Sequence, residues 1–346
     1  MPPSVYLVRN TIIIRKTIIS RSIPFGSWDS YMHDAAPPRG LIFELATPLH
    51  PDGALDEVSL GRLVGRVISQ ADGILAGSPD VGEALELSGP TRRRLCSALL
   101  TAVAGRAPLF FGITGHTAAD TRELAAAVQE ECRRLGYGGQ VFLVDLPLWY
   151  HSNRGLPQAC QRLREGASQP LILLNLPRLI SRRAPLFKRR NIRTHVFKKL
   201  AALPSVVGLI HQGDMRRFLN YHGAAARRPE FAFYEADEAN FLARPGTWGV
   251  VSPGAQLFPA FWSLVTRICL HPEEVGRDPE LQMETWNLSQ RLQKLSRAYR
   301  LRPAALLKGA LTAQGIFSSA ALAPGTPPAS PEQQEALLAL LDSLDH

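Results

Sequence analysis

The chain has 346 residues, of which 45% are hydrophobic and 20% are charged, with a formal net charge of +9. This composition excludes disordered, collagen-like and coiled-coil proteins and predicts a globular fold of one large domain or two ordinary ones. No apolar run is long enough for a transmembrane helix, and the four cysteines lack disulfide or zinc spacing, so we expect a cytoplasmic protein without membrane contact.

The first 39 residues do not share the regular pattern of the rest of the chain. Residues 11–20 are apolar and basic, which is typical of some targeting segments. A second methionine, Met32, precedes the start of the regular pattern at Gly40. We therefore expect residues 1–39 to be a poorly ordered extension, in which residues 1–31 are either a targeting segment or sequence upstream of the true start.

Residues 40–256 alternate short apolar runs with longer amphipathic segments. The short runs lie at residues 41–46, 73–76, 108–113, 141–144, 171–174, 206–210, 231–234 and 249–251. They lack an apolar/polar alternation, as expected for parallel strands that are buried on both faces. Eight strands, each followed by a helical segment, predict a (β/α)8 TIM barrel. A Rossmann sheet is disfavoured because no GxGxxG follows the first strand.

Residues 257–346 are predicted to be helical. Apolar residues recur at helical spacing in residues 257–270, 279–299, 303–311 and 331–344. These helices exceed what is needed to close a barrel. We expect them to pack as a C-terminal extension on its side.

Several segments resemble the dihydrodipicolinate synthase / N-acetylneuraminate lyase family, within the class I aldolase superfamily. The resemblance rests on residues 40–49 with the Asp52-Gly53 turn, 72–77, 112–115, 171–177, 203–208 and 249–252. It extends from Gly40 to about Leu344. It implies a TIM barrel, a carbon–carbon lyase activity of the aldolase type and a homo-oligomer (dimer or tetramer).

The resemblance also implies a lysine imine, but the chain departs from that pattern. The family's lysine ends the sixth strand in a Gly-x-Lys-Glu sequence, where this chain has Gly208-Leu-Ile-His211 and therefore Ile210. An alkyl side chain cannot form a Schiff base. The family's tyrosine after strand five maps to Leu174 and its tyrosine after strand four to Trp149. Its threonine-rich loop has Val81 here, and its arginine position is Leu179. Arg178 is one position away from the arginine position.

These departures predict a catalytically degenerate family member, a pseudoenzyme for imine chemistry, that still binds a small carboxylate or carbonyl compound. The resemblance places the ligand near Ser78, Gly82, Glu83, Tyr150 and Ser252. No cofactor and no metal are expected.

Polar residues at the predicted strand ends leave other readings open. They are Glu44, Ser78, Asp80, Glu83, His116, Asp145, His151, His211, Gln212, Glu235, Asp237 and Ser252. His211 with Glu235 or His151 could provide acid–base chemistry for a lyase, hydratase or hydrolase. A mixed His/carboxylate metal site lacks supporting HxH or HxxxH spacing. These residues could equally be an unremarkable polar rim.

A basic insert lies between the fifth and sixth predicted strands. Residues 178–199 contain nine basic residues and no acidic one. Such a segment could bind phosphates or an acidic partner, but no nucleic-acid-binding motif is present, and a solvated surface is the commoner outcome. Nucleic acid is therefore an unlikely partner. A non-catalytic scaffold or regulatory subunit that uses this insert and the C-terminal helices is a further alternative.

Overall fold

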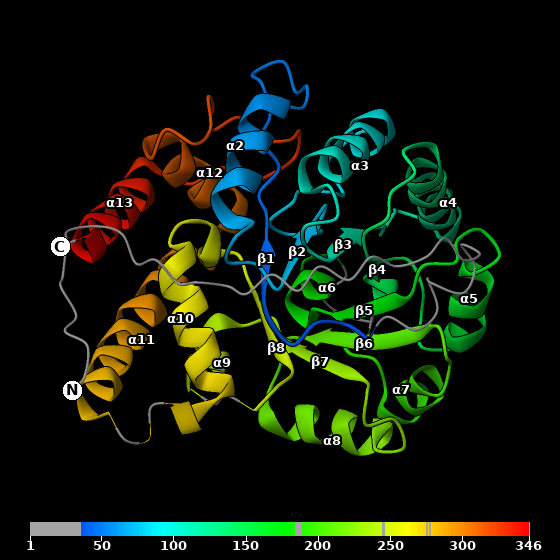
Figure 1. Ribbon diagram of the computed structural model, residues 1–346. Helices are drawn as coiled ribbons and strands as arrows, with labels where there is room; N and C mark the ends of the chain where they lie inside the picture. Colours follow the sequence, from blue (N-terminus) through cyan, green and yellow to red (C-terminus); the bar gives the residue numbers. More distant parts are fainter. Residues whose placement is uncertain (1–35, 184–188, 244–245, 275, 277, 346) are drawn as a thin grey trace.

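The computed structural model describes residues 36–183, 189–243, 246–274, 276 and 278–345. Parallel strands in sequence order close into a barrel, in which β8 pairs with β1 (Figure 1). The strands are β1 (Gly40–Glu44), β2 (Gly73–Ala76), β3 (Leu109–Gly112), β4 (Val141–Asp145), β5 (Leu171–Asn175), β6 (Val206–His211), β7 (Ala232–Glu235) and β8 (Gly249–Ser252). The predicted (β/α)8 barrel is confirmed.

The strands are apolar because helices cover the barrel and side chains fill it. Every residue of β2 to β5, β7 and β8 is buried. Closure between β8 and β1 depends on glycine, since a Cβ atom on Gly249 would lie 2.0 Å from the carbonyl oxygen of Gly40. Gly249 and Gly40 are also register partners, so this close approach sets the seam of the barrel.

Helices follow the strands and lie around the outside of the barrel (Figure 1). They are α2 (Glu57–Val67), α3 (Gly89–Val103), α4 (Ala118–Arg134), α5 (Leu156–Leu163), α6 (Pro177–Arg183), α7 (Thr194–Ala201), α8 (Met215–Ala225), α9 (Glu238–Ala243) and α10 (Pro259–Leu270). Side chains fix several starts: the Asp56 carboxylate accepts the Ser59 N–H of α2 at 2.9 Å, and Thr117 with Asp120 forms a capping box on α4.

The C-terminal helices are α11 (Pro279–Tyr299), α12 (Pro303–Ala313) and α13 (Pro331–Asp345). They pack on one another, and α11 also packs on α9 and α10. Leu292, Leu306 and Leu337 are fully buried between them. The helices therefore lie beside the barrel (Figure 1), but the end of α11 reaches the barrel mouth, which the sequence did not predict.

Residues 36–39 are attached to the barrel. The Trp248 indole donates to the carbonyl of Pro37 at 3.1 Å, and Arg39 donates to the carbonyl of Leu270 at 3.1 Å. The expectation of poor order for residues 1–35 lies outside the described residues, as do residues 184–188 of the basic insert. Within the described part of the chain, no helix combines the length and apolar character needed to cross a membrane.

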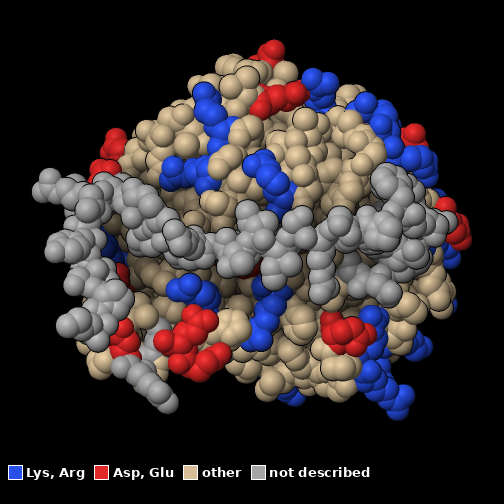
Figure 2. Space-filling view, in the orientation of Figure 1, with Lys and Arg blue, Asp and Glu red and all other residues tan. Residues whose placement is uncertain are grey.

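Charges of both signs are mixed on the face shown in Figure 2. Over α3 and α4, Arg93 pairs with Glu123 at 2.9 Å and Arg133 pairs with Glu130 at 2.5 Å. These pairs are exposed, so each contributes little to stability. Mixed charge of this kind is typical of a solvated surface rather than of a nucleic-acid interface.

A buried ion pair attaches α12 to the loop after β2. The Lys308 ammonium contacts the Glu83 carboxylate and donates to the carbonyl of Ala321 at 2.8 Å. The other Glu83 oxygen accepts the N–H of Ala323 at 2.8 Å. Burial lowers the pKa of Lys308, and the nearby Glu83 opposes that shift. Both side chains are almost fully buried, so neither charge has water as an alternative partner.

We predict that Lys308→Met lowers the free energy of unfolding by about 3–5 kcal/mol, because it leaves the Glu83 charge buried without its cation. The double variant with Glu83→Gln should lose less, since no uncompensated charge remains. Urea denaturation followed by tryptophan fluorescence measures both. A double variant as unstable as the single one would contradict this account of the pair.

Candidate functional site

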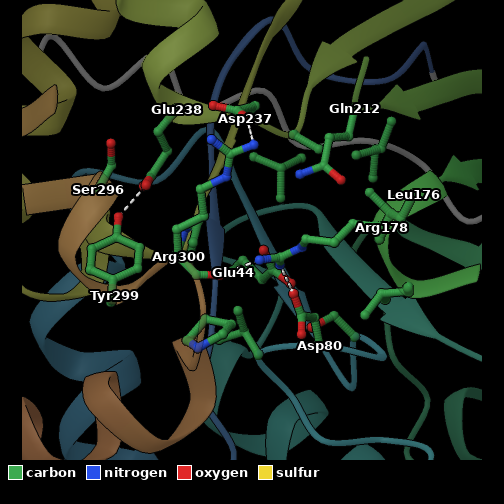
Figure 3. A pocket seen from close by; sticks show the side chains of 18 of the residues that line it. Glu44, Asp80, Leu176, Arg178, Gln212, Asp237, Glu238, Ser296, Tyr299 and Arg300 are labelled. Carbon is green, nitrogen blue, oxygen red and sulfur yellow. Dashed lines mark hydrogen bonds and ion pairs between the residues drawn. The ribbon is translucent and has the colours of Figure 1, made fainter. Parts of the chain in front are cut away.

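A cleft opens at the carboxyl ends of the strands (Figure 3). Its volume is about 760 Å³, including the open solvent at its entrance. Strand ends, α6, α9 and the end of α11 provide its walls. The lining residues include Glu44, Leu75, Ser78, Asp80, Val81, Leu174, Arg178, Leu179, Ile210, Gln212, Asp237, Glu238, Val251, Ser296, Tyr299 and Arg300. This is the end of the fold at which barrel enzymes place their sites.

The floor of the cleft is aliphatic. Ile210 of β6 and Leu174 of β5 are register partners, and both line the cleft. Leu75 of β2 and Val251 of β8 line it as well. The two positions that the resemblance assigns to a lysine and a tyrosine therefore do face the cleft, but with side chains that neither attack a carbonyl nor transfer a proton.

Glu44 ends β1 and provides a carboxyl group at this floor. The pKa of Glu44 is raised to about 8, chiefly by burial and also by the neighbouring Asp80 and Glu238, while a hydrogen bond from Ser78 and the charge of Arg178 oppose the shift. At pH 7 most of this carboxyl is therefore protonated in the unliganded protein. Glu44 can donate a proton or, once ionised, accept a cation.

Arg178 extends from the start of α6 into the cleft. Its guanidinium pairs with Asp80 and donates to the carbonyl of Arg300, while its buried Nε has no hydrogen-bond partner among the described residues. Arg182, one turn later, also reaches Asp80, at 3.5 Å. Leu179, the position aligned with the family's arginine, is a buried lining residue. Arg178 thus places a guanidinium in the cleft one residue before position 179.

The C-terminal helices supply a second polar group. The hydroxyls of Tyr299 and Ser252 donate to the Glu238 carboxylate, which also accepts the N–H of Gly254 at 2.8 Å. Burial raises the pKa of Glu238 to about 7 despite these hydrogen bonds. Arg300 contacts Asp237 at 3.4 Å across the rim. Sequence reasoning did not single out Glu238, Tyr299 or Arg300, because no local motif shows where α11 ends relative to the barrel.

Of the expected ligand-binding residues in this paragraph, Ser78 lines the cleft, whereas Ser252, Gly82 and Glu83 do not. Ser78 lines the cleft, and Ser252 lies beneath it as a donor to Glu238. Gly82 holds the loop, since its N–H donates to the Ser78 hydroxyl at 2.9 Å and its carbonyl accepts from Thr47 at 2.8 Å. Glu83 is in the ion pair with Lys308 described above, so its carboxylate does not line the cleft.

Two aromatic residues after β4 lie away from the cleft. The Tyr150 hydroxyl donates to Asp145 at 2.6 Å, and the same carboxylate accepts from Thr114 at 2.9 Å. Burial raises the pKa of Asp145 to about 6. Trp149 lines a neighbouring groove with His116 and Arg182. Val81, by contrast, lines the cleft itself.

The proposed His211 chemistry must be corrected. His211 packs against Tyr221 of α8, and its Nδ1 accepts a hydrogen bond from the Asn175 amide at 3.2 Å. Burial lowers the pKa of His211 to about 4. Because side chains alternate along a strand and Ile210 faces the cleft, His211 faces the helices outside the barrel. A buried neutral imidazole in that position cannot contact a ligand in the mouth.

Glu235 and His151, the other residues of the acid–base hypothesis, do not line the cleft either. The Glu235 carboxylate accepts the N–H of Asp237 at 2.9 Å. His151 lies after β4, where its Nδ1 contacts the Ser152 carbonyl at 2.7 Å. Among the described residues, no group of three or more His, Cys, Asp or Glu side chains is arranged to hold a metal ion.

None of the lysines in the described residues lines the cleft. Lys198 and Lys199 belong to α7, Lys294 to α11 and Lys308 to the buried pair. Lys16 and Lys188 lie outside the described residues. The chemistry of the cleft as described is therefore that of two carboxyl groups with raised pKa values, three arginines (Arg178, Arg297 and Arg300) and an aliphatic floor.

A sequence model of the Dihydrodipicolinate synthetase family matches residues 37–344. The 4-hydroxy-tetrahydrodipicolinate synthase of Thiobacillus denitrificans is 32% identical over 238 residues, which cover 66% of this chain and 73% of that protein. The enzyme of the same name from Aromatoleum aromaticum is 26% identical over 312 residues, covering 87% and 97%. The structure of the 4-hydroxy-tetrahydrodipicolinate synthase from Methylacidiphilum fumariolicum SolV superposes with a TM-score of 0.71 at 25% identity, covering 88% and 96%.

The raised pKa of Glu44 predicts a pH-dependent stability. The carboxyl titrates near 4.5 when unfolded and near 8 when folded, so the free energy of unfolding falls as the pH rises between these values. Glu44→Gln removes that contribution. We expect its gain over the wild type to grow from near zero at pH 4.5 to a few kcal/mol, roughly, at pH 8.5. Urea denaturation at both pH values measures it, and a difference independent of pH would contradict the burial of this carboxyl.

Proposed function

Because the chain belongs to the dihydrodipicolinate synthetase family, we propose that it is an aldolase-like barrel that binds a small carboxylate or carbonyl compound without forming a lysine imine. The observation that supports this is the aliphatic floor. Ile210 and Leu174 face the cleft where the resemblance implies the lysine and the tyrosine. Imine formation needs an amine that reaches the ligand carbonyl, and neither side chain provides one.

Lys308 is the described lysine that deserves the closest comparison, since burial lowers its pKa, as in many imine-forming lysines. Its ammonium, however, is held by Glu83 and by the Ala321 carbonyl, and its side chain does not line the cleft. A ligand at the aliphatic floor would therefore not meet this amine. Lys308 has a structural role in this proposal.

Arg178 is the group that we assign to the carboxylate of the ligand. Guanidinium groups bind carboxylates through several N–H donors, and the buried Nε of Arg178 still lacks a partner. Its neighbours Asp80 and Arg300 hold it in the cleft. The position is adjacent to the one that the resemblance implies for this role, so the preceding residue would compensate the loss at Leu179.

Acid–base catalysis on the bound compound is a second candidate function. It is favoured by Glu44 and Glu238, because burial brings the pKa values of both carboxyls close to neutral pH. Both line the same cleft. In such a reaction these carboxyls would take the roles that sequence analysis predicted for His211 and Glu235.

Borohydride treatment in the presence of pyruvate should leave the mass of the intact chain unchanged, because no lysine amine among the described residues lines the cleft. A family enzyme with the Gly-x-Lys-Glu sequence serves as the positive control and should gain the mass of the reduced adduct. Intact-protein mass spectrometry reads both. An adduct on any lysine of this chain that a competing carboxylate prevents would overturn the imine-free assignment.

Arg178→Gln should weaken the binding of pyruvate by about tenfold or more, as expected for loss of a charge-assisted hydrogen bond. Arg182→Gln is the matched control, since Arg182 contacts the same Asp80 but does not line the cleft. Its effect should stay below about threefold. Isothermal titration calorimetry measures both variants, and equal losses would show that Arg178 acts only through Asp80.

A further inference from the structure

The carboxylates of the cleft differ in whether they have a partner. Asp80 pairs with Arg178, and Asp237 pairs with Arg300. Glu238 accepts two hydroxyl donors and a backbone N–H. Glu44 has the Ser78 hydroxyl and, among the described residues, no ion pair with a basic side chain. Arg178 also lowers the pKa of Glu44, but its ion pair is with Asp80, so the protein compensates the charge of an ionised Glu44 only in part.

The surroundings of Glu44 favour a cation. Its neighbours on the floor are Leu75, Leu174, Ile210 and Val251, none of which donates a hydrogen bond. The charged groups that face it are Asp80 from the loop after β2, Glu238 of α9 and Arg178 of α6, with Tyr299 of α11 behind Glu238. Two of these neighbours are carboxyls, so a second anion near Glu44 would meet repulsion while an ammonium would relieve it.

A group that can bind an anion lies beside Glu44, which can bind a cation. Figure 3 shows the Arg178 guanidinium between Glu44 and Asp80 in the middle of the cleft. The Nε of Arg178 lacks a partner, as described above. A ligand that carries a positive and a negative charge on adjacent carbons could therefore contact Glu44 and Arg178 together.

We propose that the cleft recognises a small 2-amino acid, with its ammonium on Glu44 and its carboxylate on Arg178. This inference rests on the proposed function, because it names the ligand class of the same cleft. It also gives a physical reason why Ile210 stands at the floor where the family has a lysine. A barrel that does not capture a carbonyl with its own amine has no use for a lysine there, whereas a ligand that brings the amine needs a carboxylate.

The decisive comparison is between matched pairs that differ only at C2. Calorimetric titrations with alanine and pyruvate, and with leucine and 4-methyl-2-oxopentanoate, test one pair with a small side chain and one that fills the aliphatic floor. Both enantiomers of each amino acid are used. We expect one enantiomer to bind at least about tenfold more tightly than the matched 2-oxo acid, because only the ammonium compensates Glu44.

The pH dependence gives an independent readout on the wild-type protein. An ammonium binds the ionised form of Glu44, which is a minor form at pH 6, so the affinity for the amino acid should rise about tenfold or more between pH 6 and pH 8. A 2-oxo acid held by the protonated carboxyl would show the opposite slope. Glu44→Gln should abolish the pH dependence and reduce amino-acid affinity about tenfold, while the affinity for the 2-oxo acid stays within about threefold.

The outcomes separate the two proposals. Tighter binding of the 2-oxo acids, with affinity that rises as the pH falls, would overturn the amino-acid assignment and leave the proposed function intact. A borohydride-trapped adduct would overturn the imine-free function and, with it, this inference. Absence of binding by all the probes at millimolar concentration would contradict both.

Discussion

The side chain of Ile210, one residue before the end of β6, limits what the barrel mouth can do. A strand end in a closed barrel has one position that faces the centre, and in this chain that position is Ile210. Its register partner Leu174 and the neighbouring Leu75 and Val251 make the centre aliphatic. Charged groups around such a surface lose part of their hydration, so each must find a partner within the protein or in a ligand.

The rest of the cleft follows from that requirement. Arg178 and Arg300 neutralise Asp80 and Asp237, and Tyr299 with Ser252 satisfies Glu238. Glu44 remains, and the protein holds it mostly as the neutral acid, since burial raises its pKa to about 8. The fold is that of the dihydrodipicolinate synthetase family, whereas the groups at the centre of the cleft led us to propose a ligand that supplies its own charge.

Much of this arrangement could be predicted from the sequence. Unbroken apolar runs predicted parallel strands, and the rule that strand ends meet at the mouth correctly placed Glu44, Ser78, Asp80 and Asp237 there. The same alternation that puts Ile210 in the cleft excludes His211 from it, so the correction for His211 was available from side-chain parity alone.

Other features depend on geometry that no local pattern encodes. Whether Arg178 can substitute for the missing arginine at Leu179 depends on the course of α6 after Pro177. The contribution of Tyr299 and Arg300 depends on where the long helix α11 ends, and Tyr299 lies 61 residues along the chain from the Glu238 carboxylate that it contacts. The buried pair of Lys308 and Glu83 could not be predicted either, because the sequence of α12 is mostly apolar and does not show which residue its one lysine contacts.

The account is tested most directly by a high-resolution crystal structure of the wild-type protein soaked with a 2-oxo acid and, in a parallel crystal, with the matched 2-amino acid. It predicts a separate, non-covalent molecule in both, with the carboxylate at Arg178 and, for the amino acid, the ammonium within hydrogen-bond distance of Glu44. Continuous electron density between C2 of the 2-oxo acid and the Nζ atom of any lysine would contradict it.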